Sequence, residues 1–318
     1  MHSFSHIKFI TNLKQQTEFT TNSSILLAIS YGQDSLCLLK LFLDLKKKYK
    51  FKLGIIHIDH QWRDDTIQST KHLVNMIKDF NINSYIYQLN PYHYSEIEFR
   101  NLRYQIFLDT ANTYSYDYIA TAHTATDKAE TCIRNLFHSS NFDGLNSLLW
   151  LRSMSTSVKI VRPILNFTRA EVKWFCHYYI LPIWFDYTNI YYKNYRNRLR
   201  HEIIPYIKHY YGNDIEIHIN QLLDNIYLDS EYLRQSTLKV YLTIRHSSFI
   251  ALNHTMLLQQ HKALQARVLH LFFLHNTNLN VNYLFLMQLI VKVQENRKSI
   301  LKYKDLSIKN NNNWLYLT

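Results

Sequence analysis

The first 138 residues alternate between short apolar runs and longer stretches in which apolar residues recur at helical spacing. Residues 24–30 form an apolar run that is too short for a helix and is bounded by polar residues, which is typical of a buried parallel strand. Because strand-like and helix-like segments then follow each other in turn, the sequence predicts an α/β fold, a doubly wound parallel sheet of the Rossmann-like type. Ligands are expected at the carboxyl ends of its strands.

The remaining pattern places the elements and the domains. Strands are predicted over residues 24–30, 51–59, 83–89, 116–123 and 159–164, and helices over 36–48, 66–80, 96–114, 125–138 and 168–180. The Ser/Asn-rich segment 140–158 is predicted to be a loop, and 310–313 a surface turn before a last short strand. After residue 214 helical patterns dominate, notably 217–242 and 255–275. We therefore expect an N-terminal domain over residues 1–208 and a smaller, mainly helical domain over 209–318.

The charge balance indicates the kind of partner. Lys and Arg number 36 against 24 Asp and Glu, a formal net charge of +12, which favours a polyanion. The three cysteines form no C-x-x-C pair, which argues against a disulfide framework, a zinc ribbon or an iron–sulfur site. Because no apolar run approaches the ~20 residues that cross a bilayer, we expect no membrane partner.

The turn after the first strand reads Ser30-Tyr31-Gly32-Gln33-Asp34-Ser35 and leads into a helix. Such a turn directs free backbone N–H groups and the positive end of the helix dipole at one point, which favours phosphate binding. Gly32 allows close approach of an anion, and Asp34 beside phosphates suits a bridging Mg²⁺ ion. An ordinary turn capped by Asp and Ser explains the same six residues.

Several segments together resemble a known family. The turn is similar to the S-G-G-x-D-S loop of the ATP-pyrophosphatase (PP-loop) superfamily, and within it the chain resembles the tRNA(Ile)-lysidine synthetases. The further matching segments are Ile58-Asp-His-Gln-Trp-Arg63 (family V-D-H-G-L-R), Arg100-Asn-Leu-Arg-Tyr104 (R-x-x-R-Y), Ala122-His-Thr-Ala-Thr-Asp-Lys-Ala-Glu-Thr131 (G-H-T-A-D-D-Q-A-E-T), Asp143-Gly-Leu145, Arg162-Pro-Ile-Leu165 (R-P-L-L) and Arg196 to Pro205 (R-N-R-I-R-H-E-V-L-P). Their order and spacing extend over most of the chain.

The resemblance implies an activity. The family joins lysine to C2 of the wobble cytidine in the CAU anticodon of an isoleucine tRNA, through an adenylated cytidine, with release of pyrophosphate and then AMP. The product reads AUA instead of AUG and accepts Ile instead of Met. ATP, Mg²⁺, L-lysine and this tRNA are the implied ligands. A tRNA thiolase of the same superfamily, which would need clustered cysteines, and a tRNA-binding protein without catalysis are the rival interpretations.

The resemblance also assigns roles to residues. Asp34 and Asp127 are expected to be catalytic, with Asp34 holding Mg²⁺, and Asp127 and Glu130 to bind lysine. The expected ATP-binding residues are Ser30, Tyr31, Gly32, Gln33, Asp34, Ser35, His60, Arg100, Arg103 and His123, and the expected tRNA-binding residues are Arg196, Arg198, Arg200 and His201. For Arg100 and Arg103 the carboxylate of the substrate is an alternative ligand to the ATP phosphates. From the residues alone, solvated basic faces explain the arginines, a structural histidine explains His60, and an acidic first helical turn explains Asp127.

Two positions depart from the family pattern. Tyr31 stands in place of the first glycine of the loop, and if that position needs a positive φ, tyrosine costs on the order of 1 kcal/mol and crowds the phosphates. Thr126 replaces the first acid of a pair, which leaves Asp127 as its only acid.

The composition indicates the source compartment. With only 4 Gly and 4 Pro in 318 residues, it resembles translation of an AT-rich genome. We expect a plastid-encoded protein of the chloroplast stroma, with the cytoplasm of a reduced bacterium as the alternative, and a homodimer as an open option.

Overall fold

The protein is represented by a computed structural model, which describes residues 3–16, 19, 22–59, 66–89, 95–138, 142–183, 195–295, 300–304, 306–311 and 313–317. Its contacts divide the chain into two compact units, Met1–Asp224 and Asn225–Thr318. The division falls within one long helix, α10 (Ile215–Ile244). The strands and helices predicted for residues 1–208 lie in the first unit.

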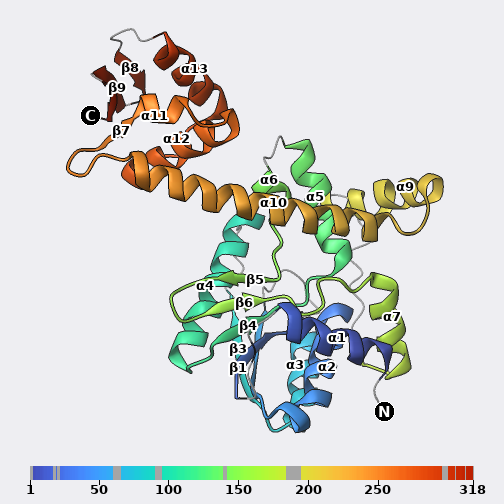
Figure 1. The fold of residues 1–318 in the computed structure, drawn as a ribbon. Helices are drawn as coiled ribbons and strands as arrows, with labels where there is room; N and C mark the ends of the chain where they lie inside the picture. The colour runs from blue at the N-terminus through green and yellow to red at the C-terminus, as the bar shows by residue number, and fades with distance from the viewer. Residues whose placement is uncertain are drawn as a thin grey trace. The chain divides into compact units, whose positions relative to one another are not determined.

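The first unit is built on a six-stranded sheet with the order β3-β2-β1-β4-β6-β5 (Figure 1). The strands are β1 (Ser24–Ala28), β2 (Lys52–Asp59), β3 (Asn83–Gln88), β4 (Tyr118–Ala120), β5 (Leu151–Ser153) and β6 (Lys159–Val161). All neighbours pair in parallel except β5 with β6. Because the strand order reverses between β1 and β4, the carboxyl ends of these two strands are where such a sheet binds ligands.

Helices cover both faces of this sheet, as the doubly wound prediction requires. Those packed on it are α1 (Phe4–Gln16), α2 (Gln33–Tyr49), α3 (Thr66–Lys78), α4 (Glu96–Thr113) and α7 (Arg169–Tyr178). The unit also contains α5 (Ala125–Phe137), α6 (Phe142–Leu145), α8 (Tyr195–Arg198) and α9 (Ile204–Tyr211). Ile25 and Leu27 of β1 pack in one core with residues of α1, α2, α3 and α7, whereas Leu26 packs in the other with α4. This alternation follows from the two-residue period of a strand.

Three local differences from the predicted elements have physical reasons. Helix α1 was not predicted because residues 4–16 are largely polar, although Phe9 is buried. The predicted loop 140–158 contains α6 and β5, and β5 has no apolar signal because it is a mostly exposed edge strand. The capping box from Thr168 to Glu171 is confirmed at the start of α7.

Two glycines outside the family segments have structural roles. A Cβ at Gly54 in β2 would collide with the ring and hydroxyl of Tyr116. Gly212 ends α9 with a φ of 100°, a conformation that side chains disfavour.

The second unit combines helices with a small antiparallel sheet. The rest of α10 is followed by α11 (His254–Leu258), α12 (Lys262–Thr277) and α13 (Tyr283–Gln294), so the predicted helix 255–275 is split in two. The sheet has the order β7-β10-β9-β8, formed by β7 (Ala251–Asn253), β8 (Ile300–Tyr303), β9 (Leu306–Asn311) and β10 (Trp314–Leu317). The predicted turn lies between β9 and β10, with Asn313 at a φ of 65°.

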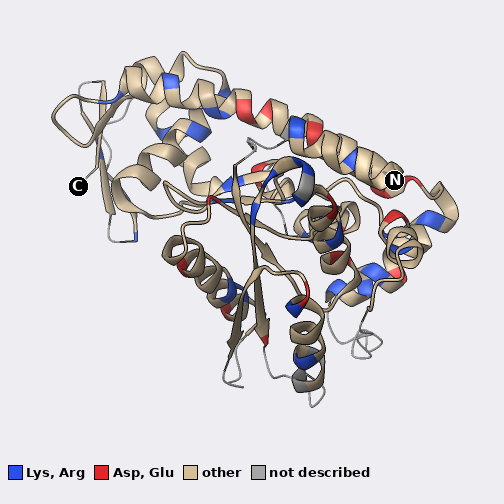
Figure 2. Cartoon of the chain, turned by 90° about the horizontal axis from the view of Figure 1, so that it is seen from below, with Lys and Arg blue, Asp and Glu red and all other residues tan. Residues whose placement is uncertain are grey.

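Helix α10 carries acidic residues over its first part, from Glu216 to Glu231, and basic residues, Arg234 and Lys239, after them. Figure 2 shows the charged residues of the chain by colour. In the part of the chain that the structure describes, none of the helices has the length and apolar character needed to span a membrane.

Candidate functional site

The turn between β1 and α2 has the geometry of an anion site. Gly32 is the N-cap of α2, with φ −64° and ψ 149°, and no side chain caps the helix there. The two serines brace the turn instead: Ser35 Oγ donates to the carbonyl oxygen of Gly32 (2.8 Å) and to that of Ser30, and Gly32 N donates to Ser30 Oγ (3.3 Å). Ser35 N also donates to the carbonyl oxygen of Gly32 (3.1 Å). No side chain of the described residues accepts from the N–H of Gln33 or Asp34, an arrangement that suits an anion.

Tyr31 does not strain this turn. It is absent from the described residues that have a positive φ, so the strain expected from the sequence is not found. Its side chain is 8% exposed and lies in the core, with its ring centroid 6.0 Å from that of His57 and 6.1 Å from that of His72. His57 donates in turn to the carbonyl oxygen of Ile29 (2.8 Å). The tyrosine thus packs behind the loop and supports it.

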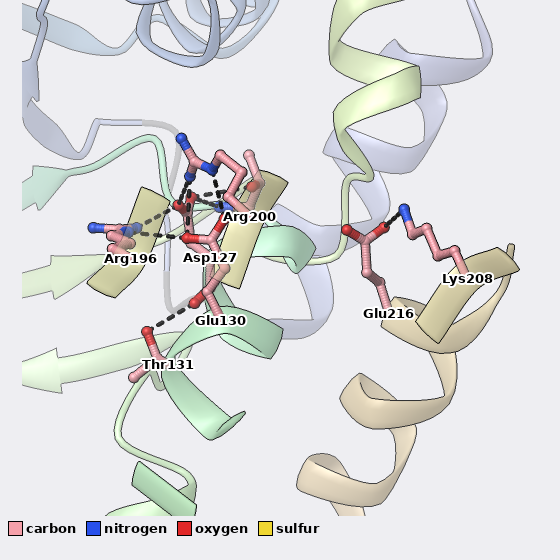
Figure 3. Close-up of polar contacts among 8 residues, drawn as sticks. Asp127, Glu130, Thr131, Arg196, Arg200, Lys208 and Glu216 are labelled. Carbon is pink, nitrogen blue, oxygen red and sulfur yellow. Dashed lines mark hydrogen bonds and ion pairs between the residues drawn. The ribbon is translucent and has the colours of Figure 1, made fainter. Parts of the chain in front are cut away.

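Four charged residues form what we call the acid–arginine quartet: Asp127 and Glu130 of α5, Arg196 of α8 and Arg200 just after it (Figure 3). Arg196 donates from Nη2 to Asp127 Oδ1 (2.6 Å) and from Nε to Glu130 Oε2 (2.9 Å). Arg200 donates from Nε to Glu130 Oε1 (2.6 Å) and from Nη2 to Glu130 Oε2 (3.1 Å) and Asp127 Oδ1 (3.3 Å). Each arginine therefore bridges both acids.

Burial and charge balance make the quartet self-contained. The side-chain exposure is 1% for Glu130, 10% for Asp127, 21% for Arg200 and 44% for Arg196. Burial alone would raise the pKa of Asp127, but Arg196, the backbone N–H of Thr124 and Arg200 together hold it below its ordinary value. Asp127 is thus a carboxylate at neutral pH, suited to holding a cation and poorly suited to taking a proton.

Asp34 lies in the field of the quartet without being bonded to it. Burial raises its pKa to about 6, with a further rise from Asp127, while Arg169 and Arg200 act in the opposite direction. The structure therefore brings the first helical turn of α2 and the acids of α5 to one site, as parallel strands β1 and β4 predict.

A second set of arginines, Arg100, Arg103 and Arg162, is called here the arginine cluster. Arg100 and Arg103 lie on α4 with their Cζ atoms 5.4 and 5.7 Å from the ring centre of Tyr104. Arg162 follows β6 and is 1% exposed. Sequence reasoning gave Arg162 no role, and its only signal was the R-P-I-L resemblance.

His123 lies between these two groups of charges. Its Nδ1 is 2.9 Å from Thr121 Oγ1. Burial lowers the pKa of His123 to about 3, with Arg162 and Arg196 adding to the shift and Asp127 opposing it. The imidazole is therefore neutral and contributes hydrogen bonding rather than charge.

The other predicted residues lie apart from this site or outside the described residues. Arg198 is exposed and pairs with Glu202 (3.3 Å), and His201 is exposed. His60 lies outside the residues that the structure describes.

Helix α5 is held from its other side by α10. Lys128, which is 4% exposed, donates to Asp224 (2.6 Å), and Asn220 donates to the carbonyl oxygen of Ala125 (3.1 Å). This support fixes the turn of α5 that carries Asp127.

The cysteines are less separated than the sequence suggested. Cys37 of α2 and Cys176 of α7 are both buried, and a hydrogen bond from Cys176 together with burial raises the pKa of the Cys37 thiol. Partial burial also raises the pKa of the Cys132 thiol. A thiol whose pKa is raised is a weaker nucleophile at neutral pH.

Comparisons with known proteins fit this geometry. Residues 5–207 match the family model of the PP-loop domain, so the first unit defines an ATP-binding protein of the PP-loop class. The chain is 42% identical to the chloroplastic tRNA(Ile)-lysidine synthase of Gracilaria tenuistipitata var. liui, over 99% of both chains, and 37% identical to that of Pyropia yezoensis, over 99% of this chain and 96% of the relative. This chain belongs to the tRNA(Ile)-lysidine synthase family.

A solved structure shares the fold. The U34-tRNA thiolase NcsA from Methanococcus maripaludis is similar with a TM-score of 0.56 and 16% identity, over 70% of this chain and 79% of that chain. At this identity the likeness bears on the fold alone.

Proposed function

We propose that this chain is an ATP-dependent ligase that joins lysine to C2 of the wobble cytidine in an isoleucine tRNA with a CAU anticodon. The observation that carries the proposal is the juxtaposition of an anion-binding turn and a pair of buried carboxylates at one sheet edge in a member of this family. The first supplies a place for ATP, and the second a place for an amine.

The turn of residues 30–35 binds the β- and γ-phosphates of ATP in this proposal. Asp34 belongs to this turn and lies in the first turn of α2. Among the described residues, no arginine is hydrogen-bonded to its carboxylate. Mg²⁺ is typically held by one or two carboxylates together with phosphate oxygens, so Asp34 fits as its protein ligand. The ion would neutralise charge on the phosphates.

The two steps of the proposed reaction depend on positioning of the substrates and require no covalent intermediate with the enzyme. The cytosine O2 attacks the α-phosphate and pyrophosphate leaves. The ε-ammonium group of lysine then loses a proton to solvent, and the neutral amine attacks C2; the C2–O bond breaks, and AMP and the proton displaced from the amine leave. Alignment of the reacting groups supplies most of such an acceleration. Asp127 and Glu130 bind an ammonium group of lysine, which requires that it replace part of the guanidinium contacts of Arg196 or Arg200.

The four basic residues of the segment 196–201 divide into two roles. Arg196 and Arg200 are bonded to the acids and form the floor of the site. Arg198 and His201 are exposed and are proposed to contact tRNA phosphates. We place the enzyme in the chloroplast stroma, in line with its chloroplastic relatives, and leave a homodimer as a proposal.

The test uses the purified chain with ATP, lysine and a transcript of the isoleucine tRNA. Lysine-dependent pyrophosphate release and lysidine in the digested tRNA are expected, whereas a transcript with a different wobble base should give neither. Turnover with a sulfur donor and none with lysine would indicate a thiolase. Tight tRNA binding with no turnover of either kind would indicate a binding protein and contradict the proposal.

A further inference from the structure

Arg162 is a buried cation that forms no ion pair with the described residues. Its side chain follows β6 and is 1% exposed. Nη1 donates to the carbonyl oxygen of Leu149 (2.5 Å), and Nε has no hydrogen-bond partner among the residues that the structure describes. Burial lowers the pKa of Arg162. Arg100 and Arg152 lower it further, and Tyr104 raises it; no Asp or Glu is among these main causes. A buried charge is tolerated when something else compensates it.

Arg103 repeats this pattern from the neighbouring helix. Its Nε is also buried without a partner in the described part of the chain. Burial lowers its pKa, with Arg100 and Arg196 adding to the shift and Tyr104 opposing it. Arg103 and Arg162 therefore both lie beside Tyr104 and repel a common neighbour, Arg100. An anion bound between them would remove an unfavourable interaction for each.

The place of this cluster connects it to the lysine site. The carboxyl ends of β4 and β6 are adjacent, since Thr121 N donates to the carbonyl oxygen of Val161 (3.0 Å). His123, just beyond β4, is influenced by Arg162 and Arg103 as well as by Asp127. The arginine cluster and the acid–arginine quartet thus border the same imidazole, one with excess positive charge and the other with paired acids.

We propose that Arg162, together with Arg103, binds the α-carboxylate of the amino-acid substrate, while Asp127 and Glu130 bind an ammonium group at its other end. This inference rests on the proposed function. Guanidinium groups match carboxylates in shape and charge. In the proposed function the phosphates of ATP bind at the start of α2, beyond the carboxyl end of β1, whereas Arg162 follows β6, two strands away in the sheet. Arg162 is therefore a specificity-determining residue that selects an amino acid over a simple diamine.

Cadaverine, which is lysine without its carboxylate, is the probe. The wild-type protein is expected to prefer lysine over cadaverine by about 100-fold in kcat/KM, because a site with buried polar groups rejects a ligand that leaves them unpaired. In Arg162→Met the preference should fall below about 10-fold through a loss confined to lysine. Arg152→Met is the matched control, since Arg152 is an exposed neighbour on β5 with the same charge; it should keep the wild-type preference.

Other outcomes are equally informative. If Arg162→Met lowers kcat/KM equally for lysine and cadaverine and raises the KM for ATP, the anion is a phosphate and the proposal is wrong. A wild-type protein that uses both amines equally well also overturns it, whereas one that uses neither contradicts the proposed function instead. Thermal unfolding checks the variant: loss of an unpaired cation should not lower Tm. If Arg162→Met does not fold, Arg103→Met takes its place and should reduce the same preference.

Discussion

The quartet and the arginine cluster both contain arginines and both border His123, but the arginines are paired with acids in the quartet and not in the cluster. In the quartet, two arginines bridge two carboxylates, and the most buried of the four, Glu130, is bonded to both. In the cluster, Arg103 and Arg162 have buried Nε atoms with no partner in the described residues. The quartet is therefore stable without a ligand, and the cluster is not fully compensated until one binds.

The quartet and the cluster therefore differ in role: the paired charges of the quartet stabilise the fold, and the unpaired charges of the cluster are available to bind a ligand. The same distinction applies to the acids. Asp34 is buried next to other carboxylates and has no hydrogen bond to an arginine among the described residues, and its pKa is raised. The ammonium end of lysine must exchange with a bonded arginine, whereas the carboxylate end and a metal ion enter places where charge is missing. Binding of the amine end should be the slower and more selective step.

The largest expected effect is at the uncompensated acid. Asp34→Ala should reduce lysine-dependent pyrophosphate release by about 10³-fold, because the variant loses the group proposed to organise charge at the phosphates. Affinity for tRNA, measured by filter binding, should stay within about twofold, since Asp34 is partly buried at the sheet edge. Asp109→Ala on the exposed face of α4 is the control. Full turnover by Asp34→Ala would place the reaction elsewhere.

The next effect is on stability and distinguishes paired from unpaired charges. Glu130→Gln should lower the free energy of unfolding by about 3 kcal/mol, because it leaves two arginines facing one carboxylate in a buried site. Glu202→Gln, which breaks the exposed pair with Arg198, should cost only about 0.5 kcal/mol. Urea denaturation measures both. Equal losses in the two variants would mean that the quartet is no stronger than a surface ion pair.

The third effect is the pH dependence due to Asp34. Its folded-state pKa is about 6 against an ordinary value of 3.8, so the folded state binds the proton more tightly than the unfolded state. This contribution to stability is complete below pH 4 and is lost as the pH rises through 6. Relative to Asp34→Asn, the wild type should therefore become less stable by about 2 kcal/mol between pH 4 and pH 7. Turnover should rise over the same interval. A constant difference between the two proteins would show that Asp34 ionises normally.

The sequence predicted the sheet, the order of its elements along the chain and the turn between β1 and α2 because these depend on local patterns. Apolar runs, helical spacing and the six residues 30–35 are each contiguous in the chain. Local patterns did not predict the direction of the Tyr31 ring, since it depends on packing against His57 of a neighbouring strand. They also left α1 unrecognised, because a helix that buries only one narrow face can be polar elsewhere.

The charge pairing was beyond the sequence for a different reason. The acids of α5 and the arginines of the segment 196–200 are about 70 positions apart by their hydrogen bonds, the closest separation being 66. The basic run contains Arg196, Arg198 and Arg200, which look alike in the sequence. Only the fold pairs two of them with the buried acids of α5 and leaves the other in an exposed pair with Glu202. Arg162 likewise looks ordinary until its burial is known.

The smallest expected effect concerns Arg198, the exposed arginine of the segment 196–200. Arg198→Ala should weaken tRNA binding by a few-fold and reduce the slope of log affinity against log salt by about 1, as expected for one lost phosphate contact. Glu202→Gln should strengthen binding slightly, because it removes the acid that competes for Arg198 (3.3 Å). Titrations of labelled tRNA at several salt concentrations measure both. If Arg200→Met lowered the salt slope as much as Arg198→Ala, the arginines of the quartet would contact RNA, and the division between paired and available charges would fail.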